Sequence, residues 1–111
     1  NKGKFNQKQV LTEESVKTLL SLQAPASTMK NTPQETEGFA YAHGAWIIQQ
    51  NEKDEPESYT VPSLSGTFPV LDLCRNYAFV FITKNKADDI KKEIFLKLKA
   101  AVDDAIPSIC N

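Results

Sequence analysis

The chain has 111 residues and a formal net charge of −1, with 41% hydrophobic and 24% charged residues. This length suits one domain, and the interspersed charges provide no basic surface for binding nucleic acid. Because the longest apolar run is too short to cross a bilayer, we expect no membrane span. The first 20 residues do not resemble a signal peptide, and the start at Asn1 suggests a mature or trimmed product.

The N-terminal residues predict a small hairpin and then a helix. Residues 3–11 have two short extended pieces around a turn at 6–8. Thr12 is a typical helix N-cap, and the two glutamates after it lie where the helix dipole favours negative charge. Apolar residues then recur at helical spacing, so we expect an amphipathic helix over residues 13–22. Residues 23–38 contain two prolines and predict an exposed connector.

The next part of the chain predicts strands. Residues 39–50 are rich in aromatic and β-branched side chains, and Gly44 within them suggests a bulge or close packing. His43 lies in this run, where we expect a packed residue rather than a catalyst. Residues 51–58 predict a charged hairpin loop, and residues 59–61 are expected to pair back.

Residues 62–83 hold two strand-like runs joined by a polar turn at 72–76. Pro69 favours an edge position or a bulge for the first run. The second run, residues 77–83, is apolar on both alternating faces, which predicts a strand covered on both sides and therefore central in its sheet.

The last element is a helix over residues 86–106. Asn85 is its expected N-cap, and Pro107 ends it. A helical apolar stripe runs through its length, comprising Ile90, Ile94, Leu98, Ala101, Val102, Ala105 and Ile106. The predicted fold class is therefore α+β, a small antiparallel sheet flanked by a short N-terminal helix and a long C-terminal helix in a single segment, residues 1–111.

Two motifs could carry chemistry. Ser27 and Lys30 match the S-x-x-K pattern of penicillin-recognising enzymes, but chance supplies such a match and no apolar face follows it, so we interpret it as a decoy. Ser63, Ser65 and Gly66 form a small polar cluster at the head of a strand. Such a cluster is either a plain turn or a place where a ligand approaches the backbone. With one histidine, the sequence predicts no His-rich metal site, and it indicates no cofactor.

Cys74 and Cys110 are the only cysteines. The last helix is roughly 31 Å long and the preceding strand about 23 Å long. If the helix packs antiparallel along the strand, its far end returns to the level of the turn that holds Cys74, residues 107–110 cover the overshoot, and the two sulfurs become neighbours. The prediction is a bridge that holds the helix on the sheet and places the protein in an oxidising compartment. Two unrelated thiols are the open alternative.

Three stretches resemble the serine β-lactamase-related family, which includes class C-like esterases and penicillin-binding relatives. They are NKGKFNQKQVLTEESVKTLL, GFAYAHGAWI and LSGTFPVLDLCRNYAFVFIT, and the terminal helix agrees in place and length. Leu64-Ser65-Gly66 is the best match to the family's third motif, although Leu64 stands where Lys or His is common. The order of elements agrees over essentially the whole chain.

The resemblance implies the C-terminal portion of a β-lactamase-like fold, a serine hydrolase acting on an ester, amide or peptide-type substrate. The family's serine–lysine and tyrosine motifs lie upstream of the matched stretches, so this chain is expected not to be catalytic alone. Ser63, Ser65 and Gly66 would line the substrate cleft. The expected partner is the missing N-terminal segment or a second copy, and the expected location is secreted or periplasmic. The alternative is a small secreted, non-enzymatic binding module.

Overall fold

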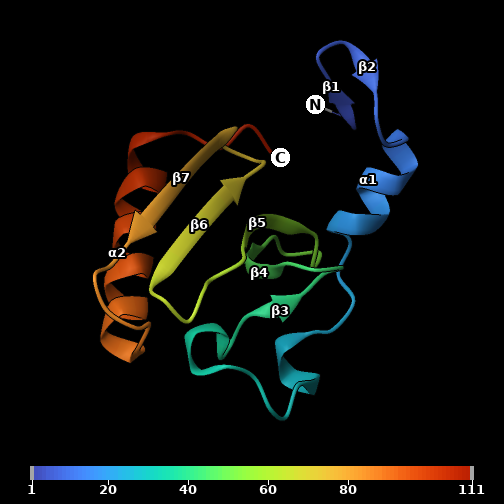
Figure 1. The fold of residues 1–111 in the computed structure, drawn as a ribbon. Coiled ribbons are helices and arrows are strands. Elements are labelled where there is room, and N and C mark those ends of the chain that lie inside the picture. The colour runs from blue at the N-terminus through green and yellow to red at the C-terminus, as the bar shows by residue number, and fades with distance from the viewer. Residues whose placement is uncertain (1, 111) are drawn as a thin grey trace.

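The computed structural model describes residues 2–110 and has an α+β architecture with two antiparallel sheets (Figure 1). One sheet is the β1–β2 hairpin, and the other has five strands in the order β3-β4-β5-β6-β7. The elements are β1 (Lys4–Phe5), β2 (Lys8–Gln9), α1 (Glu13–Leu20), the 3-10 turns η1 (Ala26–Thr28) and η2 (Gln34–Thr36), β3 (Ala40–Tyr41), β4 (Trp46–Gln50), β5 (Pro56–Thr60), β6 (Thr67–Asp72), β7 (Tyr77–Ile82) and α2 (Asp89–Ala105). No helix in this part of the chain is long and apolar enough to span a membrane.

The N-terminal hairpin and helix form as predicted. The Thr12 hydroxyl accepts a hydrogen bond from the Ser15 N–H at 3.0 Å, which caps α1. The helix ends at Leu20, two residues before the predicted end. Its C-cap Ser21 is extended, and the Ser21 N–H donates to the Thr18 carbonyl. The last turn of α1 reaches the five-stranded sheet, where the Tyr59 hydroxyl donates to the Leu20 carbonyl at 2.7 Å.

The single strand predicted over residues 39–50 is instead a hairpin of β3 and β4. The Ala42 N–H donates to the Ala45 carbonyl at 2.9 Å, and Gly44 between them has φ +94°. Glycine adopts this left-handed conformation at no steric cost, so the expected bulge is a tight turn. His43 lies in the turn and is exposed, which corrects the expectation that it packs within a strand.

β6 and β7 form a regular hairpin with six consecutive residue pairs, from Thr67↔Ile82 to Asp72↔Tyr77. β6 is an interior strand, contrary to the edge position or bulge that Pro69 suggested. Pro69 is tolerated because its missing N–H faces the β5 side, where the ladder ends at the Thr60↔Val70 pair.

β7 is one of the two edge strands of the five-stranded sheet, which contradicts its predicted central position. Its inner face packs under α2, while Ala78, Val80 and Ile82 on the outer face are exposed. The apolar character of both faces was read correctly. The prediction that both faces of this strand are covered, and that the strand is therefore central, was wrong.

α2 packs on the sheet through Phe95, whose ring stacks on Phe68 of β6 with 4.9 Å between ring centroids. The helix begins at Asp89 rather than at residue 86, because the Asp88 carboxylate caps it by accepting from the Lys91 N–H. The buried residues of α2 are Phe95 and Lys99. By contrast, most of the apolar stripe seen in the sequence is exposed, namely Ile90, Ile94, Leu98, Ala101 and Ala105.

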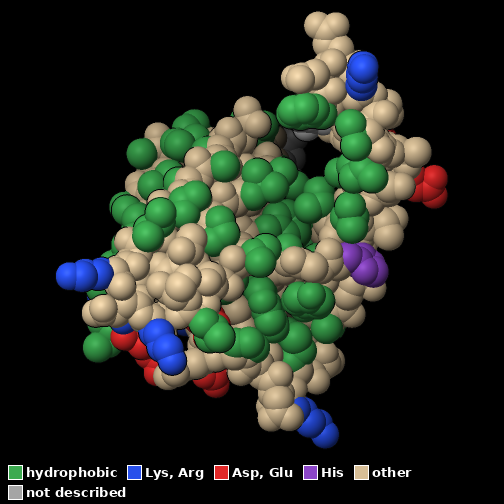
Figure 2. Space-filling view, in the orientation of Figure 1, with side chains coloured by type: hydrophobic (Ala, Val, Ile, Leu, Met, Phe, Trp, Pro, Cys, Tyr) green, Lys and Arg blue, Asp and Glu red, His purple; other side chains and the backbone are tan. Residues whose placement is uncertain are grey.

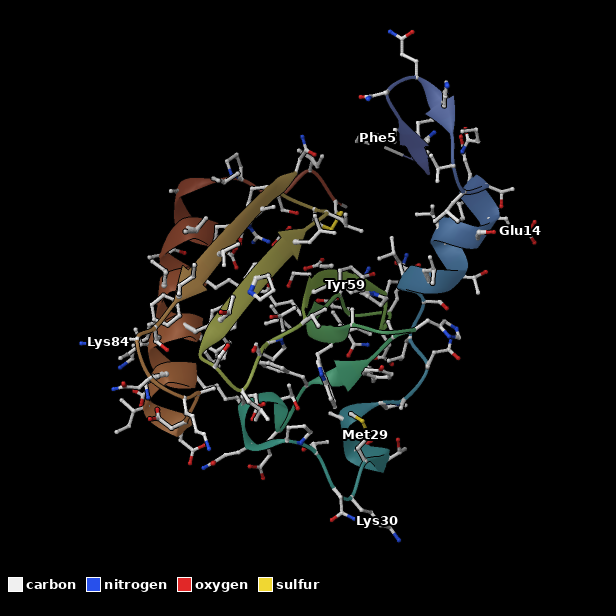
Figure 3. The ribbon with its side chains drawn as sticks, in the orientation of Figure 1. Phe5, Glu14, Met29, Lys30, Tyr59 and Lys84 are labelled. Atoms are coloured by element: carbon white, nitrogen blue, oxygen red, sulfur yellow. A yellow bond between two sulfur atoms is a disulfide. The ribbon has the colours of Figure 1, made fainter. Side chains whose placement is uncertain are left out.

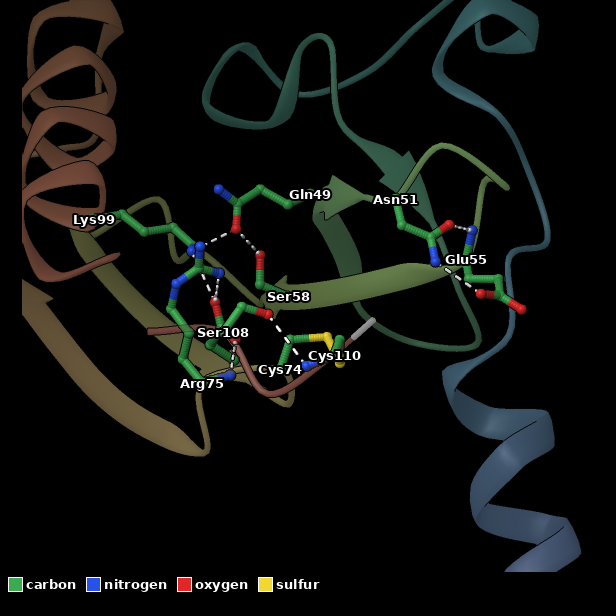
Figure 4. The surroundings of a disulfide bond; sticks show 10 residues. Gln49, Asn51, Glu55, Ser58, Cys74, Arg75, Lys99, Ser108 and Cys110 are labelled. Carbon is green, nitrogen blue, oxygen red and sulfur yellow. Dashed lines mark hydrogen bonds and ion pairs between the residues drawn. A yellow bond between two sulfur atoms is a disulfide. The ribbon is translucent and has the colours of Figure 1, made fainter. Parts of the chain in front are cut away.

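A disulfide bond joins Cys74 in the β6–β7 turn to Cys110 in the tail after α2, with an S–S distance of 2.01 Å (Figure 4). The tail also pairs with the turn through its backbone, since the Ile109 N–H donates to the Cys74 carbonyl at 2.6 Å. The far end of α2 is therefore held at the level of the turn, the arrangement expected from the strand and helix lengths.

Candidate functional site

The Ser63–Gly66 turn leads into β6 and is built by its own hydrogen bonds. The Ser63 N–H donates to the Thr67 carbonyl at 2.8 Å, and the Gly66 N–H donates to the Ser63 carbonyl at 2.9 Å. The hydroxyls of Ser63 and Ser65 lie 2.7 Å apart, and both residues are exposed. The turn therefore presents a pair of hydroxyls to solvent.

Neither hydroxyl is prepared to act as a nucleophile. Within residues 2–110, the hydrogen bonds of Ser63 Oγ and Ser65 Oγ are to each other and to the Ser65 N–H. A serine needs an adjacent general base to become nucleophilic at neutral pH. The arrangement can donate and accept hydrogen bonds, which is suited to binding or orienting a substrate.

Gly66 has a role within the chain itself. Its φ is +91°, and a Cβ at this position would collide with Thr83 Oγ1 and the Asn85 carbonyl oxygen. The Thr83 N–H donates to the Gly66 carbonyl at 2.8 Å. The close backbone approach at Gly66 is therefore made by the segment after β7, and replacement by valine would disturb this packing whether or not a substrate is bound.

The S-x-x-K match is not a catalytic pair in the structure. Ser27 lies in the 3-10 turn η1, whereas Lys30 follows that turn beyond its C-cap Met29. Both side chains are exposed, and Figure 3 shows Lys30 directed away from the sheet. The chemistry requires both residues on one α-helical turn, so the geometry agrees with their interpretation as a decoy.

A buried ion cluster, formed by Asp72, Arg75, Lys99 and Asp103, was not foreseen from the sequence. Lys99 is 2% exposed, and its ammonium donates to Asp72 Oδ2 at 3.0 Å and to Asp103 Oδ2 at 2.8 Å. It also donates to Gln49 Oε1 at 2.7 Å (Figure 4). Arg75 Nη1 lies 3.4 Å from Asp72 Oδ2 and its Nε lies 3.6 Å from Asp103 Oδ1, so two positive charges face two negative ones.

Burial and hydrogen bonds together shift the pKa values of groups in and near this cluster. Burial alone would raise the pKa of Asp103, but hydrogen bonds from Lys99, Tyr77 and Gln49 outweigh it and hold that pKa below its usual value. Burial, together with the hydrogen bond to Asp103, raises the pKa of Tyr77. On the other face of the sheet, burial raises the pKa of Tyr59 to about 12.

The cluster is closed to ligands, because the three protons of the Lys99 ammonium are directed at three protein acceptors. It holds α2 against β4 and β6 through Gln49 and Asp72. The sequence offered only the helical spacing of Phe95, Lys99 and Asp103, which places the three on one side of the helix without showing that this side faces the sheet. Among residues 2–110, no group of three or more His, Cys, Asp or Glu side chains is placed to hold a metal ion.

Two clefts lie on the face of the sheet opposite α2. The larger, of about 800 Å³, lies between α1 and the β6–β7 hairpin and includes Leu19, Leu71 and Tyr77. The smaller, of about 200 Å³, lies beside Tyr59 and Pro69. Neither is lined by Ser63, Ser65 or Gly66, so the predicted substrate-binding residues lie apart from both clefts.

Comparison with known proteins gives no relative for this chain: no protein-family model, no curated protein and no solved structure matches it.

Proposed function

We propose that this chain is the C-terminal, non-catalytic portion of a β-lactamase-related serine hydrolase that acts on an ester, amide or peptide-type substrate. The observation that carries the proposal is the apolar surface left uncovered on both sides of β7. Val80 and Ile82 on the outer sheet face are 56% and 71% exposed, and Ile94 on α2 is 48% exposed. Exposed apolar surface of this kind marks an interaction site, which a further segment of the same protein would cover in the longer product.

The order of elements supports the family assignment. A hairpin, a helix, a connector, a five-stranded antiparallel sheet and a terminal helix follow one another along the chain, in the order expected for the C-terminal part of the family. The segment before it would bring the nucleophile and its base. The Ser63–Gly66 turn would border the substrate cleft, with the Ser65 hydroxyl available to the bound acyl unit.

The test compares this chain with the longer product of its reading frame. The 111-residue chain should not hydrolyse chromogenic ester or β-lactam reporters, whereas the longer product should. In the longer product, Ser65→Ala should lower kcat/KM roughly 2- to 10-fold, the effect of losing one hydrogen bond to substrate. Ser27→Ala, a change of the same kind at an exposed site, should leave kcat/KM unchanged.

Hydrolysis by the chain alone that is lost in Ser27→Ala or Ser63→Ala would contradict the proposal, and so would a longer product without hydrolase activity. Gly66→Val is unsuitable for this purpose, because its collision with Thr83 and Asn85 would lower activity through the fold.

A secreted, non-enzymatic binding module is the second candidate. It is favoured by the cleft of about 800 Å³ between α1 and the sheet, which has the size of a small-molecule site and an apolar lining that includes Leu19 and Leu71. Both candidates imply a protein that is secreted or periplasmic, and the Cys74–Cys110 bridge is compatible with that location. A signal peptide ending directly before Asn1 in the gene would favour the binding module over the hydrolase.

A further inference from the structure

One surface of the molecule combines an unpaired strand edge with an apolar helix flank. We call it the β7 surface and define it as Ala78, Val80 and Ile82 of β7 with Ile90, Ile94 and Leu98 of α2. All six are exposed, and β7 itself contains no charged residue. Figure 1 shows α2 alongside β7 at the end of the sheet, and Figure 2 shows hydrophobic side chains gathered over the face of β6 and β7.

The backbone of β7 has a free set of hydrogen-bonding groups at this edge. The Thr83 N–H donates to the Gly66 carbonyl, and this pair lies in the same register as the β6–β7 ladder. Because hydrogen-bonded pairs recur at every second residue of an antiparallel ladder, the odd-numbered residues of β7 are the ones that bond to β6. Backbone groups alternate in direction along a strand. The N–H and C=O groups of Ala78, Val80 and Ile82 therefore point away from β6, toward solvent. Natural proteins protect such edges with charges, prolines or bulges, and β7 has none of these.

We propose that the β7 surface is self-complementary and that two copies of this chain pair antiparallel through β7, about a twofold axis midway between the two copies of Val80. In this register Val80 lies opposite Val80 of the other copy, and Ala78 lies opposite Ile82. All three residues with free backbone groups then form hydrogen bonds. On the inner face Phe79 lies opposite Phe81, so each cross-strand pair is apolar and no like charges meet.

The same axis brings the two copies of α2 into contact. Phe95 touches Phe68 of β6 and Phe79 of β7, with ring centroids 4.9 and 6.3 Å apart, so α2 lies over these two strands. With strands about 4.8 Å apart, a helix centred over the β6–β7 pair is half a spacing inside β7, and the twofold axis is half a spacing outside β7. The two helices are then about 9.6 Å apart, within the 8–10 Å typical of packed helices.

The exposed side chains of α2 face the correct way for this contact. Lys92 donates to the Glu37 carbonyl, and Lys99 donates to Gln49 of β4, so both point toward the β3–β5 side of the sheet. Ile94 is two residues from Lys92, about 200° around the helix, and therefore points toward the β7 side.

The two elements also share the position of the axis. Phe68 is paired with Phe81, so Phe95, which contacts both Phe68 and Phe79, lies at the level of Val80. Its neighbour Ile94 is then close to the axis. Ile94 would meet Ile94, and Ile90 would meet Leu98, of the other copy.

The strand register, the helix separation and the shared level of Val80 and Ile94 together favour a second copy as the occupant of this surface in the 111-residue chain. An unrelated strand could satisfy the backbone of β7 but would leave Ile90, Ile94 and Leu98 exposed, whereas one twofold operation covers the strand edge and the helix flank together. A net charge of −1 per chain opposes association only weakly. The inference does not rest on the proposed hydrolase function, although a companion segment would compete for the same surface.

Sedimentation equilibrium of the 111-residue chain tests the proposal. We expect a concentration-dependent species of twice the 12.4 kDa chain mass. Val80→Lys and Ile94→Lys should each weaken the dimer roughly tenfold or more, because each places two like charges side by side at the twofold axis. Phe5→Lys, at an exposed apolar residue of the distant N-terminal hairpin, should leave the dissociation constant unchanged.

Single cysteines on the outer face of β7 test the register. In Val80→Cys the two Cα atoms would be about 5.5 Å apart, the separation of a hydrogen-bonded antiparallel pair, and an intermolecular disulfide should form rapidly. In Ala78→Cys, on the same face of the same strand, they would be about 13 Å apart, too far for a bridge. A chain that stays monomeric up to millimolar concentration, or one in which both variants cross-link equally slowly, would overturn the proposal. Neither result affects the hydrolase assay. Hydrolysis by a monomeric longer product would not contradict dimerisation of the 111-residue chain.

Discussion

Replacing Lys99 by methionine should destabilise the protein more than any surface substitution on α2. The Lys99 side chain is 2% exposed, and its loss leaves the fully buried carboxylate of Asp72 and the nearly buried one of Asp103 with Arg75 as their remaining cation. Removing one partner of a buried ion pair costs roughly 3–5 kcal/mol. Because Arg75 remains close to both carboxylates, we expect the lower end of this range, about 3 kcal/mol.

Lys97→Met is the matched control. Lys97 lies on the same helix with an acidic partner four residues away, Glu93, but both side chains are mostly exposed and solvent screens the pair. With an unfolding slope of about 2 kcal/mol per molar urea, Lys99→Met should lower the urea midpoint at pH 7 by about 1.5 M, and Lys97→Met should leave it nearly unchanged. Equal midpoints for the two variants, measured by circular dichroism, would refute the assignment of the cluster as the link between α2 and the sheet.

Three further outcomes follow from the structure. Gly66→Ala should lower the free energy of unfolding by at least about 1 kcal/mol more than Gly44→Ala, because both glycines have positive φ but only a Cβ at Gly66 meets other atoms; equal losses would contradict this. Removing the Cys74–Cys110 bridge, which closes a 36-residue separation, should cost about 4 kcal/mol in urea denaturation, and an unchanged midpoint would count against it. The folded pKa of Asp103 lies below its unfolded value of 3.8, so the stabilisation by its carboxylate is present above that pH and declines as the pH falls further. Asp103→Asn should therefore make the free energy of unfolding depend less steeply on pH between about pH 5 and 2, and an unaltered pH dependence would disprove this.

Local signals predicted the elements well where one residue type determines the outcome. Thr12 caps α1, and the polar turn between β6 and β7 forms where its composition indicates. Gly44 was recognised as special, but a bulge and a tight turn have the same sequence signature. The predicted start of α2 was too early in the chain because Asn and Asp are both good N-caps, so the sequence alone did not distinguish Asn85 from Asp88.

The remaining features depend on contacts between distant segments. The apolar pattern on both faces of residues 77–82 favours burial of both faces, but it does not specify whether this chain or another one covers them. Lys99 meets Asp72 only after α2 returns along the sheet, so the local sequence shows a charged helix residue and not a buried one. The hydroxyl pair of Ser63 and Ser65 was located, whereas the reason for Gly66, its contact with Thr83 and Asn85, required the fold.

The most direct test of the proposed function is labelling with a fluorophosphonate probe that reacts with activated serines, followed by mass mapping of the adduct. We expect no adduct on the 111-residue chain. In the longer product of the reading frame, we expect a single adduct on a serine upstream of Asn1. An adduct on Ser27, Ser63 or Ser65, or a longer product that never reacts, would contradict it.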